Sequence, residues 1–265
     1  EKMSNNKRIM TKWAQEVTPS HVWNEYPRPQ MVRKDWKNLN GLWEYAISGR
    51  TEKPLEFDGQ ILVPFAIESQ LSGVQKRIKA DECLWYRRTF KIPSQWNKKR
   101  IKLNFGAVDW EAEVFVNGKR MGVHQGGYDP FSFDITDVLE QGDEQLLEVR
   151  VWDPTSRGTQ PRGKQVTEPH GIWYTPVSGI WQTVWIEPVP EVSIETIRML
   201  PDIDTERIVI KANGDRKIED GYSILVNVFD GGTKIATGKG TPQKEMDIKI
   251  DNPKLWSPEN PFLYD

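Results

Sequence analysis

The chain has 265 residues, of which 37% are hydrophobic and 28% charged, and its formal net charge is −2. These values are typical of a folded globular protein; they exclude a disordered chain and provide no long-range attraction to nucleic acid or an anionic membrane. No apolar run approaches the roughly 20 residues of a membrane-spanning helix. Cys83 is the only cysteine, so an intramolecular disulfide is excluded and we expect stability to come from packing.

Alternation of apolar and polar side chains, which predicts strands, dominates the first part of the chain. It is clearest over residues 101–105, 114–116, 131–135 and 147–151. The second of these segments is followed by Asn117-Gly118, a dipeptide that favours a tight hairpin. We expect the cations Lys98 to Arg100, just before the first of them, to lie on a solvated strand edge.

A proline pair marks the best domain boundary, at Glu187-Pro188-Val189-Pro190-Glu191. Two prolines two residues apart do not fit a central strand, and they stiffen a linker. Strand patterning resumes beyond it, at 208–210, 224–228 and 246–250. We therefore predict an all-β chain with a lead-in at 1–18, a sandwich at 19–187 and a second sandwich at 191–265. The last of these is shorter than the ~100 residues of a complete immunoglobulin-like domain.

Two long stretches without strand patterning, residues 68–82 and 153–176, interrupt the first sandwich. Long loops on a rigid scaffold often carry function. The chain has 12 tryptophans, a residue whose ring stacks well on sugars. Those in or beside strands are expected in the cores: Trp43, Trp85, Trp152, Trp181 and Trp185. Trp173 lies in the second long loop and is a candidate ligand-facing residue.

Residues that carry chemistry are sparse. The three histidines, His21, His124 and His170, are scattered, and with one cysteine they give no zinc-site spacing. No G-x-S-x-G elbow is present, and the paired glycines are followed by no helix start that would cradle phosphate. We therefore expect no metal, no cofactor and no catalytic residue within this chain.

Six segments together resemble the amino-terminal part of glycoside hydrolase family 2, the family of β-galactosidases, β-glucuronidases and β-mannosidases. They occur in the family's order and approximate spacing over nearly the whole chain. The segments are Leu39-Asn40-Gly41-Leu42-Trp43, Val63-Pro64-Phe65 with Glu68-Ser69, Leu84-Trp85-Tyr86-Arg87-Arg88-Thr89-Phe90, Asn104 to Asp109 with Val114 to Gly118, Val177-Ser178-Gly179-Ile180-Trp181, and Leu255-Trp256-Ser257-Pro258 with Pro261-Phe262-Leu263-Tyr264.

The resemblance implies a jelly-roll domain, then an immunoglobulin-like sandwich cut short at its end, then a TIM barrel beyond this sequence. In the family the barrel carries both catalytic glutamates, so retaining hydrolysis of O-glycosidic bonds would follow there. The implied partners are a glycoside substrate and the barrel of the same chain, and a homo-oligomer is possible. No nucleic-acid or membrane partner is expected.

One expected site residue departs from the family pattern. The β-galactosidase and β-glucuronidase branches place a sugar-contacting Asp six residues before the glycine that matches Gly179, and here that position is Trp173. Either Glu168 or His170 substitutes for the Asp, or the sugar is recognised differently. We expect the loop from Arg162 to Tyr174 to form one wall of the active site, with substrate-facing candidates Arg162, Lys164, Glu168, His170 and Trp173; packing against the barrel without substrate contact is the alternative.

Two other functions stay open from the sequence. A free-standing carbohydrate-binding module fits the tryptophan content, and a purely structural pair of sandwiches fits the strand pattern. The start Glu1-Lys2-Met3 has no apolar signal core. The compartment is therefore unknown, with the periplasm or secretion favoured over the cytoplasm.

Overall fold

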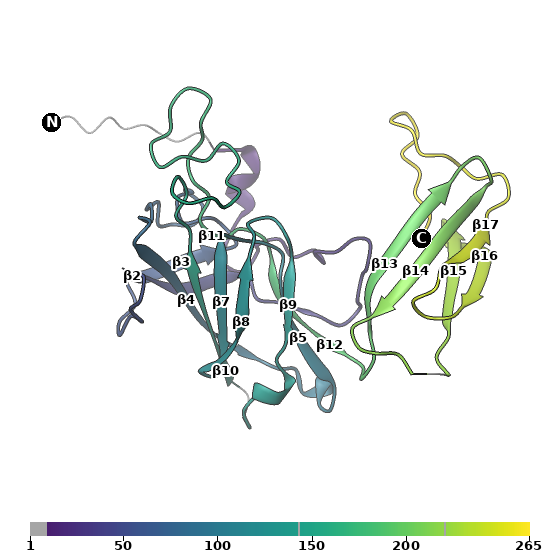
Figure 1. The fold of residues 1–265 in the computed structure, drawn as a ribbon, viewed down its shortest axis with the longest axis horizontal. Helices are drawn as coiled ribbons and strands as arrows, with labels where there is room; N and C mark the ends of the chain where they lie inside the picture. The colour runs from purple at the N-terminus through teal and green to yellow at the C-terminus, as the bar shows by residue number, and fades with distance from the viewer. Residues whose placement is uncertain (1–9, 143, 220) are drawn as a thin grey trace. The chain divides into compact units, whose positions relative to one another are not determined.

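The fold was analysed in a computed structural model, which describes residues 10–142, 144–219 and 221–265 (Figure 1). The first nine residues of the predicted lead-in lie outside the described residues, and Lys12–Glu16 form the 3₁₀ helix η1. The chain divides into two compact units between Pro188 and Val189. Each unit is described below by itself.

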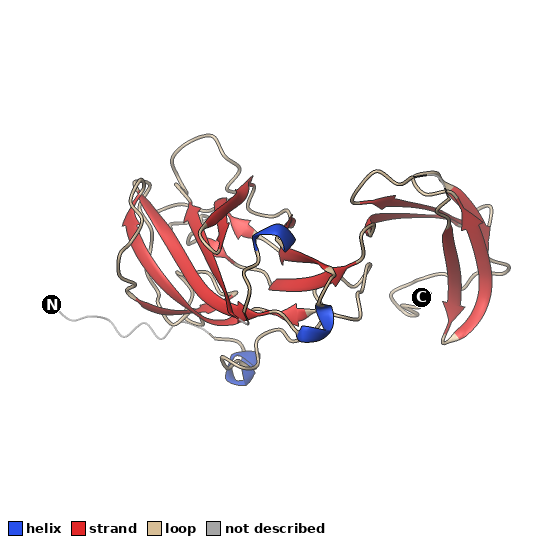
Figure 2. Ribbon diagram, turned by 90° about the horizontal axis from the view of Figure 1, so that it is seen from below, coloured by secondary structure: helices blue, strands red, loops and turns tan. Residues whose placement is uncertain are grey.

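The first unit is built on two main sheets. Within the described residues, one has six strands in the order β3 (Gly59–Val63), β2 (Gly41–Gly49), β4 (Glu82–Lys91), β10 (Glu144–Trp152), β7 (Glu111–Val116) and β8 (Lys119–Gln125). The other has four, in the order β1 (Lys37–Asn38), β12 (Val184–Val189), β5 (Arg100–Phe105) and β9 (Phe131–Asp134). A short pair joins β11 (Gly179–Ile180) to β6 (Val108–Asp109). The described part contains two further helical turns, η2 (Ser94–Trp96) and η3 (Thr136–Val138), so strands dominate (Figure 2).

The main core lies between these two sheets, because strands of both contribute to one buried cluster. β7 shows the alternation that the sequence predicted, with Ala112, Val114 and Val116 buried and the residues between them partly exposed. From the four-stranded sheet, Leu103 of β5 and Ile186 of β12 enter the same cluster. The two inner faces therefore pack as a β-sandwich.

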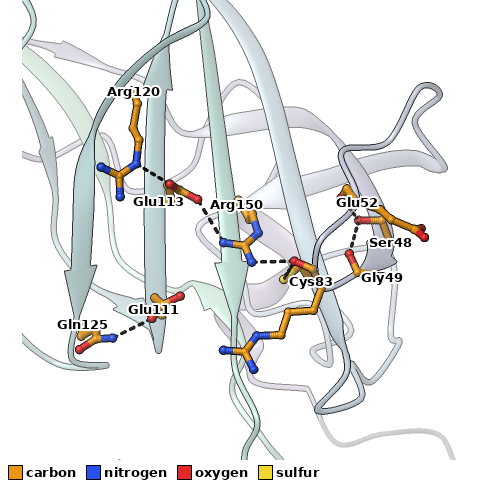
Figure 3. A network of polar contacts seen from close by, with 10 residues as sticks. Ser48, Gly49, Glu52, Cys83, Glu111, Glu113, Arg120, Gln125 and Arg150 are labelled. Carbon is orange, nitrogen blue, oxygen red and sulfur yellow. Dashed lines mark hydrogen bonds and ion pairs between the residues drawn. The ribbon is translucent and has the colours of Figure 1, made fainter.

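The outer face of the six-stranded sheet is held by ion pairs. Glu113 accepts from Arg120 at 2.5 Å and from Arg150 at 3.1 Å, and Arg150 also donates to the Arg50 carbonyl at 2.7 Å (Figure 3). Beneath the charges, Trp85 packs in a smaller apolar cluster around Ala46 and Cys83. Two of the tryptophans expected in the core, Trp85 and Trp152, therefore lie on this outer face.

The outer face of the four-stranded sheet is covered by the segment 22–36. Glu187 of β12 has no exposed side chain; it accepts a hydrogen bond from Tyr26 at 2.8 Å and pairs with Arg28 and, at 3.2 Å, with Arg33. Both faces of β5, which pairs with β9 in the same sheet, are buried as well. The expectation that Arg100 is solvated is wrong: it is 8% exposed and pairs with Asp134 at 2.8 Å.

The second unit has two small sheets around a separate core. One contains β13 (Ile194–Asp202), β14 (Arg207–Gly214) and β17 (Met246–Lys249), and the other contains β15 (Ile224–Asp230) and β16 (Thr233–Gly240). The core cluster is small: Ile210, Val228, Met246, Ile248 and Ile250. At its end the chain turns back to β15, where the backbones of Phe229 and Asp265 exchange two hydrogen bonds of 2.7 and 3.1 Å.

The predicted fold class, an all-β chain of two sandwiches, is confirmed. In the part of the chain that the structure describes, no helix is long and apolar enough to cross a membrane.

Candidate functional site

A loop of residues 153–178 joins β10 to β11 and projects beyond the strand ends (Figure 1). Buried carboxylates hold both of its ends. Asp153, at its start, accepts from the Ser178 hydroxyl at 2.7 Å, while Glu68 accepts from the Ser178 backbone N–H at 3.0 Å. Asp153 also accepts from the Thr155 N–H at 2.9 Å. Ser178 thus ties the two ends of the loop to each other and to the first long stretch of the sequence.

The middle of the loop is fastened by Gln165, which is 9% exposed. Its side-chain amide donates to Asp109 of β6 at 3.1 Å, and its amide oxygen accepts from the Val177 N–H at 2.6 Å. The backbone of Tyr174 lies beside residues 164–166. Its N–H donates to the Lys164 carbonyl at 2.7 Å, and its carbonyl accepts from the Val166 N–H at 3.0 Å. The loop is therefore an ordered segment that is held by its own hydrogen bonds and by one to β6.

The three carboxyl groups beneath the loop are nearly inaccessible, with Glu68 and Asp153 3% exposed and Asp109 5% exposed. Burial raises the pKa of Glu68 to about 7. Burial, with the negative charge of Asp153 nearby, also raises the pKa of Asp109 to about 7. The pKa of Asp153 is raised by burial as well. Low-dielectric surroundings disfavour the charged form of each group.

A cleft of about 320 Å³ opens where the loop passes over β6 and the segment 127–128. We call it the Asp109 cleft. Asp109 and Gln165 contribute its buried polar groups, and the remaining lining residues are Tyr128, Arg162, Lys164, Tyr174, Thr175, Val177 and Trp181. The Trp181 indole donates to the Gly127 carbonyl at 2.7 Å, and its ring meets Tyr128 edge to face. The cleft thus combines aromatic surfaces with a carboxyl group, an amide and two cations.

The structure brings two of the five predicted site residues together, Arg162 and Lys164, in the Asp109 cleft. Glu168 lies outside this lining, with its side chain 89% exposed and 3.7 Å from Arg77. His170 is exposed, and its Nδ1 lies 2.8 Å from the Glu168 carbonyl oxygen. Trp173 is 37% exposed and donates its N–H to the His170 carbonyl at 2.9 Å. The last three form a neighbouring, outward-facing part of the loop.

Sequence reasoning missed Asp109, Gln165 and Tyr128 as parts of the site. It also placed Trp181 in a core, whereas that side chain is only partly buried and lines the cleft. The strand pattern did not predict Asp109 as a site residue, because it directly follows Ala107 and Val108, which are typical core residues of a strand. Gln165 is one of many polar residues in the loop, and only the folded path shows that it faces inward.

Within residues 10–142, 144–219 and 221–265, no group of three or more His, Cys, Asp or Glu side chains is arranged to hold a metal ion. Glu68 and Asp153 are committed to holding the loop. The lining of the Asp109 cleft offers hydrogen-bonding groups and aromatic rings.

Comparison with known families gives two matches. The description "Glycosyl hydrolases family 2, sugar binding domain" matches residues 36–190, and "Glycosyl hydrolases family 2" matches residues 192–265. The first match covers more than half of the chain and contains the whole Asp109 cleft. The resemblance predicted from the six sequence segments is confirmed.

Individual relatives agree with the family matches. A β-galactosidase of Thermoanaerobacter pseudethanolicus is 31% identical over 68% of this chain and 25% of its own length, and a β-glucuronidase of Paenibacillus borealis is 25% identical over 90% and 43%. A solved Ruminococcus gnavus β-glucuronidase in complex with uronic deoxynojirimycin superposes with a TM-score of 0.72 at 22% identity, covering 90% of this chain and 42% of that one. The chain thus spans less than half the length of these relatives.

Proposed function

Because the chain belongs to glycosyl hydrolase family 2, we propose that it is the non-catalytic amino-terminal part of an enzyme that hydrolyses O-glycosidic bonds in carbohydrates. The observation that carries the proposal is the pair of consecutive family matches over residues 36–265, on a chain whose described residues form sandwiches and no barrel. Catalysis then belongs to a TIM barrel of the same polypeptide. The substrate is a β-glycoside, as the names of the relatives suggest.

The second unit has an open apolar surface beside its core. A groove of about 550 Å³ beside its core is lined mainly by apolar side chains, among them Ile208, Val226 and Val228. Such a surface is normally covered. Beside this groove, the backbones of Phe229 in β15 and Asp265 are hydrogen-bonded to each other. We propose that residues 191–265 belong to an immunoglobulin-like sandwich whose apolar groove is covered in the complete enzyme.

The loop 162–174 is proposed to form one wall of the active site in the complete enzyme. Its support is the ordered backbone, which presents Trp173, Glu168 and His170 outward, next to the two cations of the cleft. Ring stacking by Trp173 would replace the hydrogen bonds that a carboxylate makes with sugar hydroxyls. The loop would then position substrate while the barrel performs the chemistry.

Replacing Trp173 by Ala in the complete enzyme tests this role. Loss of a stacking surface is expected to lower kcat/KM for aryl β-glycosides about fivefold, since one aromatic contact contributes on the order of 1 kcal/mol. Trp13→Ala is the matched control, because Trp13 is 59% exposed and lies outside the loop. An unchanged kcat/KM for several glycosides in the Trp173→Ala enzyme would refute the proposal that the loop 162–174 contacts substrate. It would not refute the proposal that the complete protein is a hydrolase.

A further inference from the structure

We propose that Glu68, Asp109 and Asp153 together form a pH-sensitive switch, which holds the loop 153–178 in place while the carboxyl groups are protonated and releases it as they ionise. The inference concerns the folded chain itself. Its consequence for an enzyme rests on the proposed function, in which part of this loop forms one wall of the active site.

The three carboxyl groups come from separate parts of the chain and meet beneath the loop. Glu68 belongs to the first long stretch without strands, Asp109 to β6, and Asp153 to the start of the loop. Ser178 lies between two of them, because its N–H donates to Glu68 at 3.0 Å and its hydroxyl donates to Asp153 at 2.7 Å. Asp153 is also close enough to Asp109 for its charge to add to the effect of burial on the pKa of Asp109. The three groups therefore form one cluster.

This cluster holds the loop at several points. Asp153 and Glu68 bind Ser178 at the end of the loop, and Asp153 is itself part of the start. In the middle of the loop, the Gln165 side chain donates to Asp109 at 3.1 Å. A change in the charge of the cluster therefore acts on both ends and on the middle of the loop at once.

The cluster lacks the cations that usually accompany buried carboxylates. Glu187, which is also buried, pairs with Arg28 and Arg33. Among the described residues, Asp109 and Asp153 form no ion pair. A buried carboxylate without a cation is costly, and a protonated carboxyl group avoids that cost.

The lining of the Asp109 cleft adds four titratable or charged side chains, which are Tyr128, Arg162, Lys164 and Tyr174. Its two cations favour ionisation of Asp109, but the nearer hydrogen-bond partner of Arg162 is the Ser156 carbonyl, at 2.6 Å. Burial of Asp109 outweighs the cations, since it raises the pKa of Asp109 to about 7.

The other sides of the cluster carry one neutral group and several exposed ones. Tyr86 of β4 lies near Glu68, and burial raises the pKa of this tyrosine, so its hydroxyl stays neutral. On the exposed side of the loop, Arg77 donates to the Thr167 carbonyl at 2.9 Å and lies 3.7 Å from Glu168. His170 is exposed as well. Solvent and salt screen the charges of these exposed groups, so they act on the cluster only weakly.

Hydrogen bonds and burial act in opposite directions on the cluster. The donors of Ser178 and Gln165 favour the charged carboxylates, whereas burial and mutual repulsion favour the protonated groups. Burial prevails, because it raises the pKa of both Glu68 and Asp109 to about 7 and also raises the pKa of Asp153. Ionisation therefore favours a state in which water reaches the carboxylates, and the loop that covers them has to move for this.

The loop is consequently held most firmly at low pH. The pKa values of about 7 lie above the ordinary values of 4.5 for Glu68 and 3.8 for Asp109, which apply once the groups are hydrated. The loop in place thus binds protons more tightly than the released loop. Stabilisation by the cluster is complete below about pH 4 and is lost as the pH rises through 7. In the complete enzyme, the wall would be ordered in acid and mobile above neutral pH.

The test is amide hydrogen exchange of the chain of residues 1–265, followed by mass spectrometry from about pH 5.5 to pH 8.5. Dividing each rate by that of an unstructured peptide at the same pH removes the intrinsic pH dependence of exchange. We expect the opening of residues 162–178 to become at least about tenfold more favourable over this range. At each pH the loop should exchange at least about a hundredfold faster than β10, because it is released without unfolding of the sheet.

Neutral variants identify the groups responsible. Asp109→Asn is expected to reduce the pH dependence of loop exchange, and the double variant with Glu68→Gln to abolish it, because the amides cannot ionise. Matched controls are Asp247→Asn and Glu259→Gln, two exposed residues of the second unit, which should leave the profile unchanged. If the double variant does not fold, the wild-type profile and Asp109→Asn still decide the question.

A further variant separates loosening of the loop from its titration. Gln165→Ala removes the attachment to Asp109 but leaves all three carboxyl groups. It should speed loop exchange at every pH and keep the increase with pH, whereas the neutral variants should lose that increase.

Three outcomes would overturn the proposal. They are loop exchange whose normalised rate does not rise with pH, a rise that the neutral variants leave unchanged, and loop exchange no faster than that of β10. None of them bears on hydrolysis by the complete enzyme. Failure of the complete enzyme to hydrolyse glycosides would likewise leave the exchange profile intact and remove only its consequence for an active site.

Discussion

At the scale of single residues, Glu187 shows how a buried charge organises the first unit. Its carboxylate has no exposed surface and accepts from the Tyr26 hydroxyl and the Trp185 indole while it pairs with Arg28 and Arg33. A buried carboxylate is tolerated only when cations and donors surround it. The segment 22–36 supplies most of them, so it is part of the sandwich and not an appendage.

Removing this charge should be costly. We expect Glu187→Gln to lower the free energy of unfolding by about 3 kcal/mol, because two guanidinium groups lose their counter-charge. This value is at the low end of the roughly 3–5 kcal/mol expected for breaking a buried ion pair, because Arg28 and Arg33 are partly exposed to solvent. Urea unfolding measures the change. The matched variant Glu245→Gln, whose pair with Arg198 is exposed, should cost less than about 0.5 kcal/mol. Equal losses of stability in the two variants would show that the ion pairs of Glu187 do not hold the segment 22–36 on the sheet.

The buried carboxyls beneath the loop predict a pH dependence. The folded-state pKa of Asp109, about 7, lies above its unfolded value near 3.8, so the folded state binds the proton more tightly. Its contribution to stability is therefore present below pH 4 and is lost as the pH rises through 7. The Asp109→Asn variant should thus gain stability relative to the wild type between pH 5 and pH 8, by urea unfolding at each pH. A difference that does not vary with pH would contradict this assignment.

Some of these residues could be predicted from the sequence and others could not. The candidates Arg162 and Lys164, which line the Asp109 cleft, were named from the sequence because they belong to a long polar loop, where function concentrates. Asp109 was not, because its role depends on pairing between β6 and β11, residues about 70 positions apart. Glu187 likewise has its partners some 160 positions earlier in the chain. Local patterns carry no information about such contacts.

At the scale of elements, the loop 153–178 depends on its close approach to β4 at Gly179. The Tyr86 hydroxyl accepts from the Ile180 N–H at 3.1 Å, and a Cβ atom on Gly179 would lie 2.0 Å from that hydroxyl. Gly179 also has a φ of +90°. The start of β11 can therefore reach the buried tyrosine only with glycine at this position.

Gly179→Ala is consequently expected to destabilise the first unit by about 3 kcal/mol or more, from backbone strain of about 1–2 kcal/mol together with a steric clash. Gly73→Ala is a close control: its φ is +79° with no atom within 4 Å of the added Cβ, so only the backbone strain applies. Thermal or urea unfolding of both variants measures the difference. A loss in Gly179→Ala no greater than in Gly73→Ala would show that the contact with Tyr86 is unimportant.

Gln165 fastens the middle of the same loop. We expect Gln165→Ala to speed amide hydrogen exchange across residues 162–178, because Asp109 and the Val177 N–H lose their shared partner. Exchange in β10, which pairs with β4 and β7 in the sheet, should stay slow. Gln125→Ala, which removes a surface hydrogen bond to Glu111 (Figure 3), should leave the loop protected. Unchanged exchange in the loop of Gln165→Ala would mean that other contacts hold it.

At the scale of the whole molecule, the sequence predicted the fold class well. Alternation over β7 and the Asn117-Gly118 turn between β7 and β8 identified strands correctly, since their outer faces are solvated. Alternation over β5 predicted one buried face, but both faces are buried, and Arg100 on the second face pairs with Asp134 of β9. The prediction failed where an ion pair with a residue of another strand accompanied the burial of a polar side chain.

The family assignment gives the two units a common role. Under the proposed function, the jelly-roll unit supplies one wall of the binding site and a barrel supplies the catalytic groups. Neither unit needs catalytic groups of its own in this arrangement. Two buried carboxyl groups of the first unit, Glu68 and Asp153, hold a loop, as their hydrogen bonds to Ser178 show.

The most direct test of this account is the hydrolysis of aryl β-glycosides by two purified proteins, the chain of residues 1–265 and the complete polypeptide that contains it. The account predicts turnover by the complete polypeptide and none by the chain. Turnover by the pure chain, or its absence from the complete polypeptide over a panel of β-galactoside, β-glucuronide, β-mannoside and β-glucoside substrates, would contradict it.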